Sequence, residues 1–227
     1  MDRFMRLELL IGKEKRDKLK QSHVLVVGLG GVGGYVVESL ARSGIGKLTL
    51  IDFDIIDITN SNRQVIAVTS TIGKSKATSW KERILDINPE AEVIIHEVRL
   101  TKDNVEDYIN PSTDAIIDAC DTLEVKKELI RYSLKNNKLS ITVTGTALKK
   151  DPSKLEVMEL QKTAYDPIAR ELRKMVKLEF PKRKLMVVCS TESPMKRVTE
   201  SLPSAVFVPS VAGILAANYI FKKLIGE

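Results

Sequence analysis

The chain has 227 residues, of which 43% are hydrophobic and 29% are charged, an ordinary composition for a globular protein with a substantial core. Its two cysteines stand far apart and form no CxxC pair, which argues against a disulfide scaffold and a four-cysteine zinc site and fits a reducing compartment. Its formal net charge is +6, and the charged residues at 1–6 exclude an apolar signal segment there, so we expect a cytoplasmic protein.

An amphipathic, charge-rich segment comes first, and residues 1–22 are predicted to form a helical arm. The segment HVLVVGLGGVGGYVVESLARSGIGKLTLIDFD, residues 23–54, follows it. Its apolar residues 24–27 predict a buried strand, helical spacing continues from Val32 to about residue 42, and residues 47–51 predict the next strand. The rest of the chain is organised around this strand, turn, helix and strand.

The glycine-rich turn of this segment has the pattern of a phosphate-binding loop. Gly28 allows the tight turn, Gly30 lets the backbone approach a phosphate, and Gly33 lets the helix pack closely on the strand. Backbone N–H groups at the start of the helix would then face the anion. Asp52 follows at roughly the 20-residue distance at which an acidic residue binds a ribose hydroxyl.

Strands and helices alternate beyond this segment, which indicates an α/β fold with a Rossmann-like, doubly wound and mainly parallel sheet. The expected elements are a helix from residue 71 or 73 to about 86, a strand at 91–98, a short helix at 103–109, a strand at 113–118, a helix at 123–136 and a strand at 139–144. Residues 23–145 would therefore form a nucleotide-binding half.

After residue 145 the rhythm changes, and residues 146–227 are predicted to add a mixed or antiparallel part to the same domain. The expected elements are strands at 155–160 and 185–189, a basic helix at 167–177 and a final helix at 210–224. The apolar run at 205–221 is shorter than the ~20 residues that span a bilayer, so we predict a buried helix and no transmembrane span. The sequence Phe221-Lys222-Lys223 leaves a peripheral membrane contact open.

The positive charge is concentrated in the second half. Residues 149–197 hold thirteen Lys and Arg against seven Asp and Glu, an excess of six that equals the net charge of the whole chain. This indicates a polyanionic partner, and a solvated basic face is the alternative that composition leaves open. Aromatic residues make up only 5% and give no sign of a base-stacking platform, so a nucleic acid would be bound mostly through its phosphates.

Polar residues stand at three strand ends of the predicted sheet, at positions 28–33, 52–63 and 118–122. Ligands of doubly wound sheets bind outside the carboxyl ends of the strands. These ends offer a phosphate cradle, a ribose acceptor and a carboxylate suited to Mg²⁺ on a polyphosphate. Asn60 and Arg63, together with Lys76, add donors that stabilise phosphate charge. An NAD enzyme needs only the first two ends, so ATP and nucleotidyl transfer are favoured.

Four motifs in order, GLGGVGG, IDFDIIDITNSNRQ, IGKSKA and IIDACDT, resemble the adenylation fold of the ThiF, MoeB, HesA and ubiquitin-activating proteins, and the resemblance covers nearly the whole chain. It implies an enzyme that activates a carboxylate on the α-phosphate of ATP, releases pyrophosphate and leaves an acyl adenylate. The segment RFMRLELLIG is similar to the arm of that family, whose second arginine, here Arg6, reaches across a homodimer to the γ-phosphate.

The resemblance also implies the roles of individual residues. The nucleotide would be bound by Gly28, Gly30, Gly31, Gly33, Asp52, Asp54, Asn60, Arg63 and Lys76. The catalytic residues would be Arg6, Arg63, Lys76 and Asp121, and Asp121 would also hold Mg²⁺. Taken singly, Arg63 and Lys76 also fit surface charges, Asp121 fits a helix N-cap, and Arg6 fits a solvated arm.

The second half narrows the resemblance to one branch. The segments KKDPSKLEVMEL, KTAYDPIARELRKMVK, LMVVCSTESP and FVPSVAGILAANYI resemble the tRNA threonylcarbamoyladenosine dehydratases, known as TcdA or CsdL. This implies a tRNA substrate carrying threonylcarbamoyladenosine, ATP and Mg²⁺ as cofactors, and a homodimer. Sulfur-carrier activators usually hold zinc on two CxxC pairs, which this sequence lacks, so no zinc is expected. Sulfur-transfer proteins stay open as partners.

Two departures from that branch bear on the substrate. Gly145-Thr146-Ala147-Leu148 stands where the family usually has glycine-alanine-glycine-asparagine, in a loop that shapes the substrate or a monovalent-cation site for Na⁺ or K⁺. Residues 191–203 are also shortened and divergent. An adenylyltransferase for a ubiquitin-like sulfur carrier, and a nucleotide-binding module without turnover, therefore remain alternatives.

Cys189 ends an apolar strand and is interpreted as a buried structural thiol rather than an acyl or sulfur acceptor.

Overall fold

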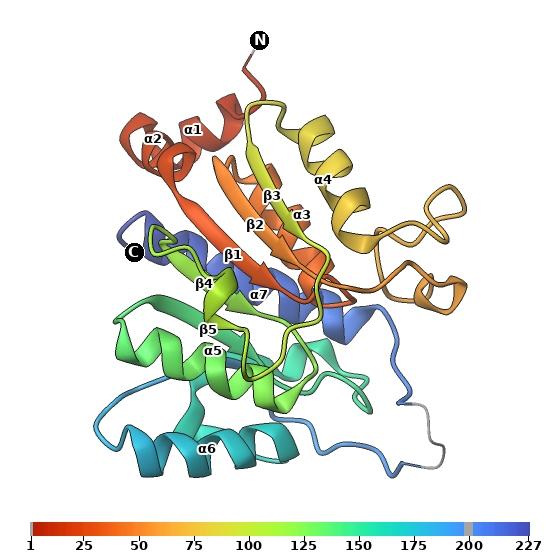
Figure 1. The fold of residues 1–227 in the computed structure, drawn as a ribbon, viewed down its shortest axis with the longest axis vertical. Helices are drawn as coiled ribbons and strands as arrows, with labels where there is room; N and C mark the ends of the chain where they lie inside the picture. The colour runs from red at the N-terminus through yellow and green to blue at the C-terminus, as the bar shows by residue number, and fades with distance from the viewer. Residues whose placement is uncertain (1, 198–201) are drawn as a thin grey trace.

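The computed structural model describes residues 2–197 and 202–227, and a seven-stranded sheet runs through them (Figure 1). The strand order is β3-β2-β1-β4-β5-β7-β6, and all neighbours are parallel except β6 and β7, which are antiparallel. The strands are β1 His23–Val27, β2 Lys47–Ile51, β3 Glu92–His96, β4 Ala115–Asp118, β5 Leu139–Val143, β6 Leu155–Glu159 and β7 Met186–Ser190. The predicted Rossmann-like sheet with an antiparallel C-terminal part is confirmed.

Helices cover both faces of the sheet. Successive side chains of a strand point to opposite faces, so each strand contributes to two cores. Val24 and Val26 of β1 pack in one core with α3, α4 and α7, whereas Leu25 and Val27 pack in another with α5. The helices are α1 Met5–Ile11, α2 Lys13–Gln21, α3 Gly33–Arg42, α4 Lys76–Ile87, α5 Leu123–Lys135, α6 Pro167–Glu179 and α7 Phe207–Leu224. Short 3-10 turns are η1 Ile58–Asn60, η2 Glu106–Tyr108, η3 Pro152–Lys154 and η4 Leu160–Lys162.

The predicted helical arm consists of two helices, because Gly12 at φ +85° separates α1 from α2. Two further helix predictions need correction. The helix expected from residue 71 or 73 begins only at Lys76, where the Ser75 side chain caps it by accepting from the Thr78 N–H at 3.2 Å. The short helix expected at 103–109 is reduced to the 3-10 turn η2. Met1 and part of the divergent segment 191–203 lie outside the described residues.

The final helix, α7, is buried as predicted and lies beside α3 (Figure 1). The close approach requires Gly213, since a Cβ there would stand 2.3 Å from the Val32 carbonyl oxygen at the start of α3. The helix begins at Phe207 rather than at residue 210, with Pro209 in its first turn, where proline removes no internal hydrogen bond. No described helix has the length and apolar character needed to cross a membrane.

Candidate functional site

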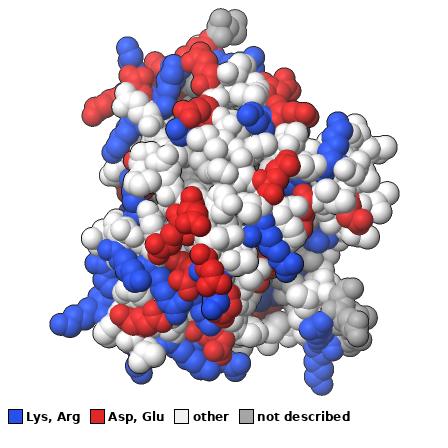
Figure 2. All heavy atoms as spheres, in the orientation of Figure 1, with Lys and Arg blue, Asp and Glu red and all other residues white. Residues whose placement is uncertain are grey.

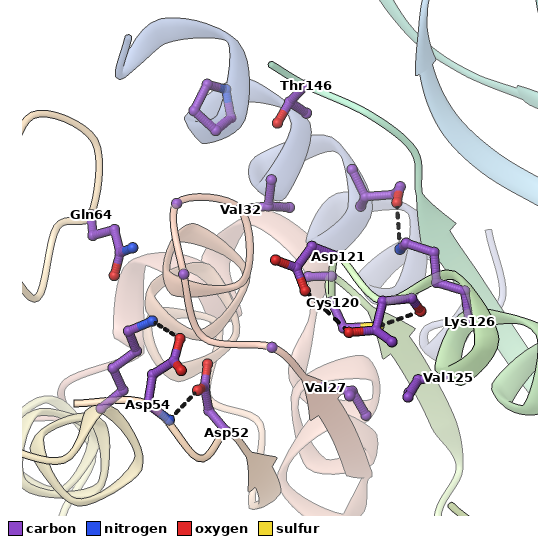
Figure 3. Close-up of a pocket in the computed structure, with 18 of the residues that line it drawn as sticks. Val27, Val32, Asp52, Asp54, Gln64, Cys120, Asp121, Val125, Lys126 and Thr146 are labelled. Carbon is purple, nitrogen blue, oxygen red and sulfur yellow. Dashed lines mark hydrogen bonds and ion pairs between the residues drawn. The ribbon is translucent and has the colours of Figure 1, made fainter. Parts of the chain in front are cut away.

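A cavity of about 470 Å³ opens at the carboxyl ends of β1, β2 and β4, the position at which doubly wound sheets bind their ligands. Asp52 and Asp54 lie on one side of the glycine turn, and Asp121 and Lys126 lie on the other (Figure 3). The sequence-predicted residues that line the cavity are Gly28, Gly30, Gly31, Asp52, Asp54, Asn60, Arg63, Lys76 and Asp121. Gly33 and Arg6 do not line it.

The glycine turn is shaped by close packing. Gly28 has φ +84°, and a Cβ there would stand 2.8 Å from the Ala119 carbonyl oxygen. A Cβ on Gly33 would stand 1.7 Å from the Gly28 carbonyl oxygen, so Gly33 allows α3 to approach β1 closely. Gly30 faces more open space, with only the Gln64 side chain near its Cβ position, at 3.6 Å. Backbone and the start of α3 therefore face the cavity, as phosphate binding requires.

Asp52 is held firmly at the end of β2. One carboxylate oxygen accepts from the Leu29 N–H at 2.6 Å and the other from the Asp54 N–H at 2.9 Å. Burial raises the pKa of Asp52, and the positive charge of Lys76 and these two N–H groups partly counter the shift. The carboxylate thus couples the glycine turn to the next strand, in the place where a ribose hydroxyl would be bound.

Lys76 is nearly buried, and its Nζ lies 2.7 Å from a carboxylate oxygen of Asp54. Because α4 begins at Lys76, its side chain leaves the first turn of the helix at the cavity. Arg63 and Asn60 come from the loop between β2 and α4. The Arg63 guanidinium donates to the Thr59 carbonyl oxygen at 3.1 Å and to Asn62 Oδ1 at 2.9 Å. These partners are neutral, so the guanidinium keeps its full charge for an anion.

Asp121 is exposed at the rim of the cavity, and its described hydrogen bond is a 3.3 Å contact with the Thr122 hydroxyl. Thr122, not Asp121, is the N-cap residue of α5. The described residues contain no group of three or more His, Cys, Asp or Glu suited to a metal ion. A single available carboxylate fits Mg²⁺, which proteins bind through one or two carboxylates together with substrate phosphates.

A buried ionic cluster beneath Asp121 was missed by the sequence analysis. Lys126 Nζ lies 3.1 Å from Asp118 Oδ1 and donates to the Val143 carbonyl oxygen at 2.8 Å. The Cys120 thiol contacts the same Asp118 oxygen at 3.1 Å. Burial opposes the charge of Lys126, but the Asp118 carboxylate outweighs it and raises the pKa of Lys126 above its usual value. The cluster joins the ends of β4 and β5 below the turn that carries Asp121.

Replacing Lys126 by methionine is expected to lower the free energy of unfolding by about 3–5 kcal/mol, because it leaves the Asp118 charge buried without a positive partner. Denaturant unfolding followed by circular dichroism measures the change. Lys135→Met, at an exposed position near the end of the same helix, is the matched control and should stay within about 0.5 kcal/mol of the unmodified protein. Equal stability of the two variants would contradict a structural role for the ion pair.

The divergent loop after β5 is also anchored by a buried ion pair. The Gly145 N–H donates to Asp166 Oδ2 at 2.8 Å, and Lys149 Nζ donates to the Gly145 carbonyl oxygen at 3.0 Å. Lys149 and Asp166 lie 3.7 Å apart with nearly inaccessible side chains. Gly145, Thr146 and Ala147 line the cavity, so this pair positions the loop at the cavity wall.

Neither cysteine has the surroundings of a reactive thiol. Cys189 is buried, as predicted, and burial is the main cause that raises its pKa. Burial likewise raises the pKa of the Cys120 thiol well above its usual value. A raised pKa disfavours the nucleophilic thiolate, which supports the structural interpretation of Cys189.

Arg6 lies far from the cavity of its own chain. It is an exposed residue of α1, and α1 and α2 lie beside the amino end of β1, opposite to the cavity (Figure 1). Arg3, on the same arm, donates to the Asp86 carbonyl oxygen near the end of α4 at 3.4 Å. One chain therefore does not bring Arg6 to the site.

Comparisons with known proteins agree with this geometry. The model of the ThiF family matches residues 1–227. The tRNA threonylcarbamoyladenosine dehydratase of Bacillus subtilis is 39% identical, over 100% of this chain and 96% of that protein. Crystal structures of Escherichia coli tRNA N6-threonylcarbamoyladenosine dehydratase, TcdA, are 36% identical over 98% of this chain. The AMP complex has a TM-score of 0.92 and 94% of its chain is covered, and the ATP complex has 0.91 and 93%.

Proposed function

The chain belongs to the ThiF family, and we propose that it is an ATP-dependent tRNA threonylcarbamoyladenosine dehydratase. The observation that carries the proposal is the full-length similarity to enzymes of that name, combined with one cavity that gathers a glycine turn, a ribose-side carboxylate, two cations and a rim carboxylate. A nucleotide-binding module without turnover would not need the two cations and the rim carboxylate.

The reaction would proceed in two steps. The threonyl carboxylate of the modified adenosine attacks the α-phosphorus of ATP, pyrophosphate leaves, and an acyl adenylate forms. The carbamoyl group of the same nucleoside then attacks the activated carbonyl carbon, AMP leaves and the ring closes, with net loss of one water from the nucleoside. Because the nucleophile is tethered beside the acyl group, proximity supplies much of the second step.

The residues of the cavity divide this work. The glycine turn and the first turn of α3 bind phosphate, and Asp52 orients the ribose. Arg63 and Lys76 place positive charge where negative charge develops on the phosphates. Lys76 would exchange its contact with Asp54 for a contact with a phosphate oxygen when ATP binds. Until then, Asp54 would keep the ammonium group of Lys76 at the cavity. Asp121 would hold Mg²⁺, which neutralises charge on the polyphosphate when bound.

Several further features belong to the same proposal. The chain would act in the cytoplasm as one domain and as a homodimer, in which Arg6 of each arm would complete the site of the other subunit. A monovalent cation at the loop after β5, sulfur-transfer partners and a peripheral membrane contact stay predictions, as does the expected lack of zinc.

The proposal is tested by incubating the protein with ATP, Mg²⁺ and tRNA carrying threonylcarbamoyladenosine, followed by mass spectrometry of the nucleosides. We expect the nucleoside to lose the mass of one water only when ATP is present, with pyrophosphate and AMP formed in equal amounts. An unchanged nucleoside on tRNA that binds the protein would refute the proposal. The test would then move to the C-terminal carboxylate of a ubiquitin-like sulfur carrier.

A further inference from the structure

Tyr165 is an exposed aromatic residue held in a fixed and strained backbone conformation just before α6. The residue is 61% exposed and its φ is +56°, in the left-handed region that is unfavourable for a residue with a side chain. Strain of this kind persists only where the surroundings impose it, and it is concentrated at functional sites. The ring contributes nothing to the hydrophobic core that would explain it.

Buried polar residues on both sides impose this conformation. Before Tyr165, the buried Thr163 hydroxyl donates to the Leu160 carbonyl oxygen at 2.7 Å, and Arg173 donates to the Thr163 carbonyl oxygen at 2.8 Å. After it, the buried Asp166 caps α6 by accepting from the Ala169 N–H at 2.9 Å. The ring is therefore presented to solvent by a rigid segment, and little entropy would be lost when a ligand packs on it.

The same anchors place the Tyr165 backbone beside residues of the cavity wall, although Tyr165 itself does not line the cavity. Asp166, its neighbour, accepts from the N–H of the cavity residue Gly145 at 2.8 Å. Ile168, three residues after Tyr165, lines the cavity itself. A ligand that extends out of the cavity on the side of the loop after β5 would meet this ring.

Exposed cations accompany the ring along η4 and α6. Lys162, Arg170 and Lys174 are exposed, and Figure 2 shows Lys and Arg side chains along the lower margin of the molecule, where α6 lies. Glu171 faces both Arg170 at 3.5 Å and Lys174 at 2.9 Å. One carboxylate cannot neutralise two exposed cations, so the surface stays positive.

We propose that Lys162, Tyr165, Arg170 and Lys174, here called the Tyr165 platform, bind the single-stranded RNA loop that carries the substrate nucleoside. The ring stacks on a base next to the nucleoside that enters the cavity, and the three cations bind neighbouring phosphates. This rests on the proposed function and adds to it the surface that receives the RNA outside the cavity.

The chemistry of the substrate favours RNA at this place. A nucleoside of an RNA enters an enzyme cavity only when it leaves the stack of bases around it. The neighbouring bases then lose a stacking partner. Proteins that bind single-stranded loops replace that partner with an aromatic ring and bind the phosphates with cations. The low aromatic content of the chain does not exclude a platform of this kind, because one aromatic ring is enough to stack on one base.

The first test is the affinity of the full-length protein for tRNA carrying threonylcarbamoyladenosine. Tyr165→Ala is expected to raise the Kd for this tRNA about 5- to 150-fold, the range of losing one base–aromatic stack, whereas Tyr165→Phe keeps the ring and should bind like the unmodified protein. Leu178→Ala, which removes an exposed apolar side chain near the far end of α6, is the matched control. The Kd for ATP, measured by calorimetry, should be the same in all four proteins and shows that they are folded.

The second test is the salt dependence of binding. Arg170→Ala and Lys174→Ala should each reduce the slope of log K against log salt by about 0.7, the value for one phosphate contact on a single strand. Lys18→Ala, an exposed cation of α2, should leave the slope unchanged.

The outcomes separate the platform from the proposed function. If the unmodified protein converts the modified tRNA and Tyr165→Ala binds it with unchanged Kd, the platform is refuted and the function stands. If the unmodified protein neither binds nor converts it, both fail. Loss of binding to a ubiquitin-like carrier in Tyr165→Ala, with tRNA binding intact, would likewise overturn the platform.

Discussion

Replacing Asp121 by alanine is expected to lower ATP-dependent turnover by at least about 10²- to 10³-fold, the loss that follows when a preorganised electrostatic group is removed from a reaction centre. The carboxylate is exposed and makes a long contact with Thr122, so its loss should leave the fold and the midpoint of denaturant unfolding unchanged. Pyrophosphate release with modified tRNA measures the turnover. Arg63→Ala should show the same combination of lost turnover and intact fold.

A matched control distinguishes a specific role from a general effect of charge. Asp103 is an aspartate outside the cavity lining, on the segment that follows β3, with a side chain that is 80% exposed. Asp103→Ala removes the same charge from the surface and should retain full turnover. Full activity in Asp121→Ala or Arg63→Ala would refute the assignment of the site, whatever the identity of the substrate.

The nucleotide-binding half was predictable because its signals are local. The strand before Gly28, the glycine turn and the strand ending before Asp52 all lie within about thirty residues, and glycine spacing reports the close contacts of Gly28 and Gly33 directly. The start of α4 was harder to predict from the sequence. Ser75 and Thr71 are both acceptable N-cap residues by type, and only the hydrogen bond between the Ser75 side chain and Thr78 shows which one is used.

The ion pairs that support the site could not be predicted in this way. Lys126 looks like any other lysine of an amphipathic helix until β5 brings the Val143 carbonyl oxygen to it from 17 residues away. Asp166 looks like a plain N-cap, which it is, and its second bond to Gly145 spans 21 residues. A lysine eight residues after a strand-end aspartate offers no signal that the two are buried together, because burial is decided by the packing of the sheet.

The basic excess of the second half shows the same limit. It indicated a polyanionic partner, but several of its cations have structural partners. Lys149 is buried against Asp166, Lys184 lies 2.9 Å from Glu159, and Arg183 donates to the Leu134 carbonyl oxygen at 2.8 Å. The number of Lys and Arg residues in the second half therefore overstates the number of cations that remain to bind RNA. The position of Tyr165 between buried anchors locates that surface more narrowly than composition does.

Replacing Arg6 by alanine is expected to lower turnover by about 10³- to 10⁵-fold, the contribution of an arginine supplied in trans to a phosphoryl group, although Arg6 does not line the cavity of its own chain. The surface of α1 supports a partner at the arm. Leu9 and Leu10, neighbours on α1, are 80% and 81% exposed, and contiguous exposed apolar patches mark interaction sites. A second copy would cover them and carry its own Arg6 toward the first.

Mixed dimers test this arrangement directly. An Asp121→Ala subunit still carries Arg6, and an Arg6→Ala subunit still carries Asp121, so a dimer of the two contains one complete site. With random mixing of equal amounts, half of the dimers are mixed and each has one working site of two, so about a quarter of the activity should return if the dimer is symmetric. The two variants alone should remain inactive at the same concentration. If subunit exchange is demonstrated and no activity returns, Arg6 does not act across the dimer, and an Arg6→Ala protein with full turnover would remove it from the site altogether.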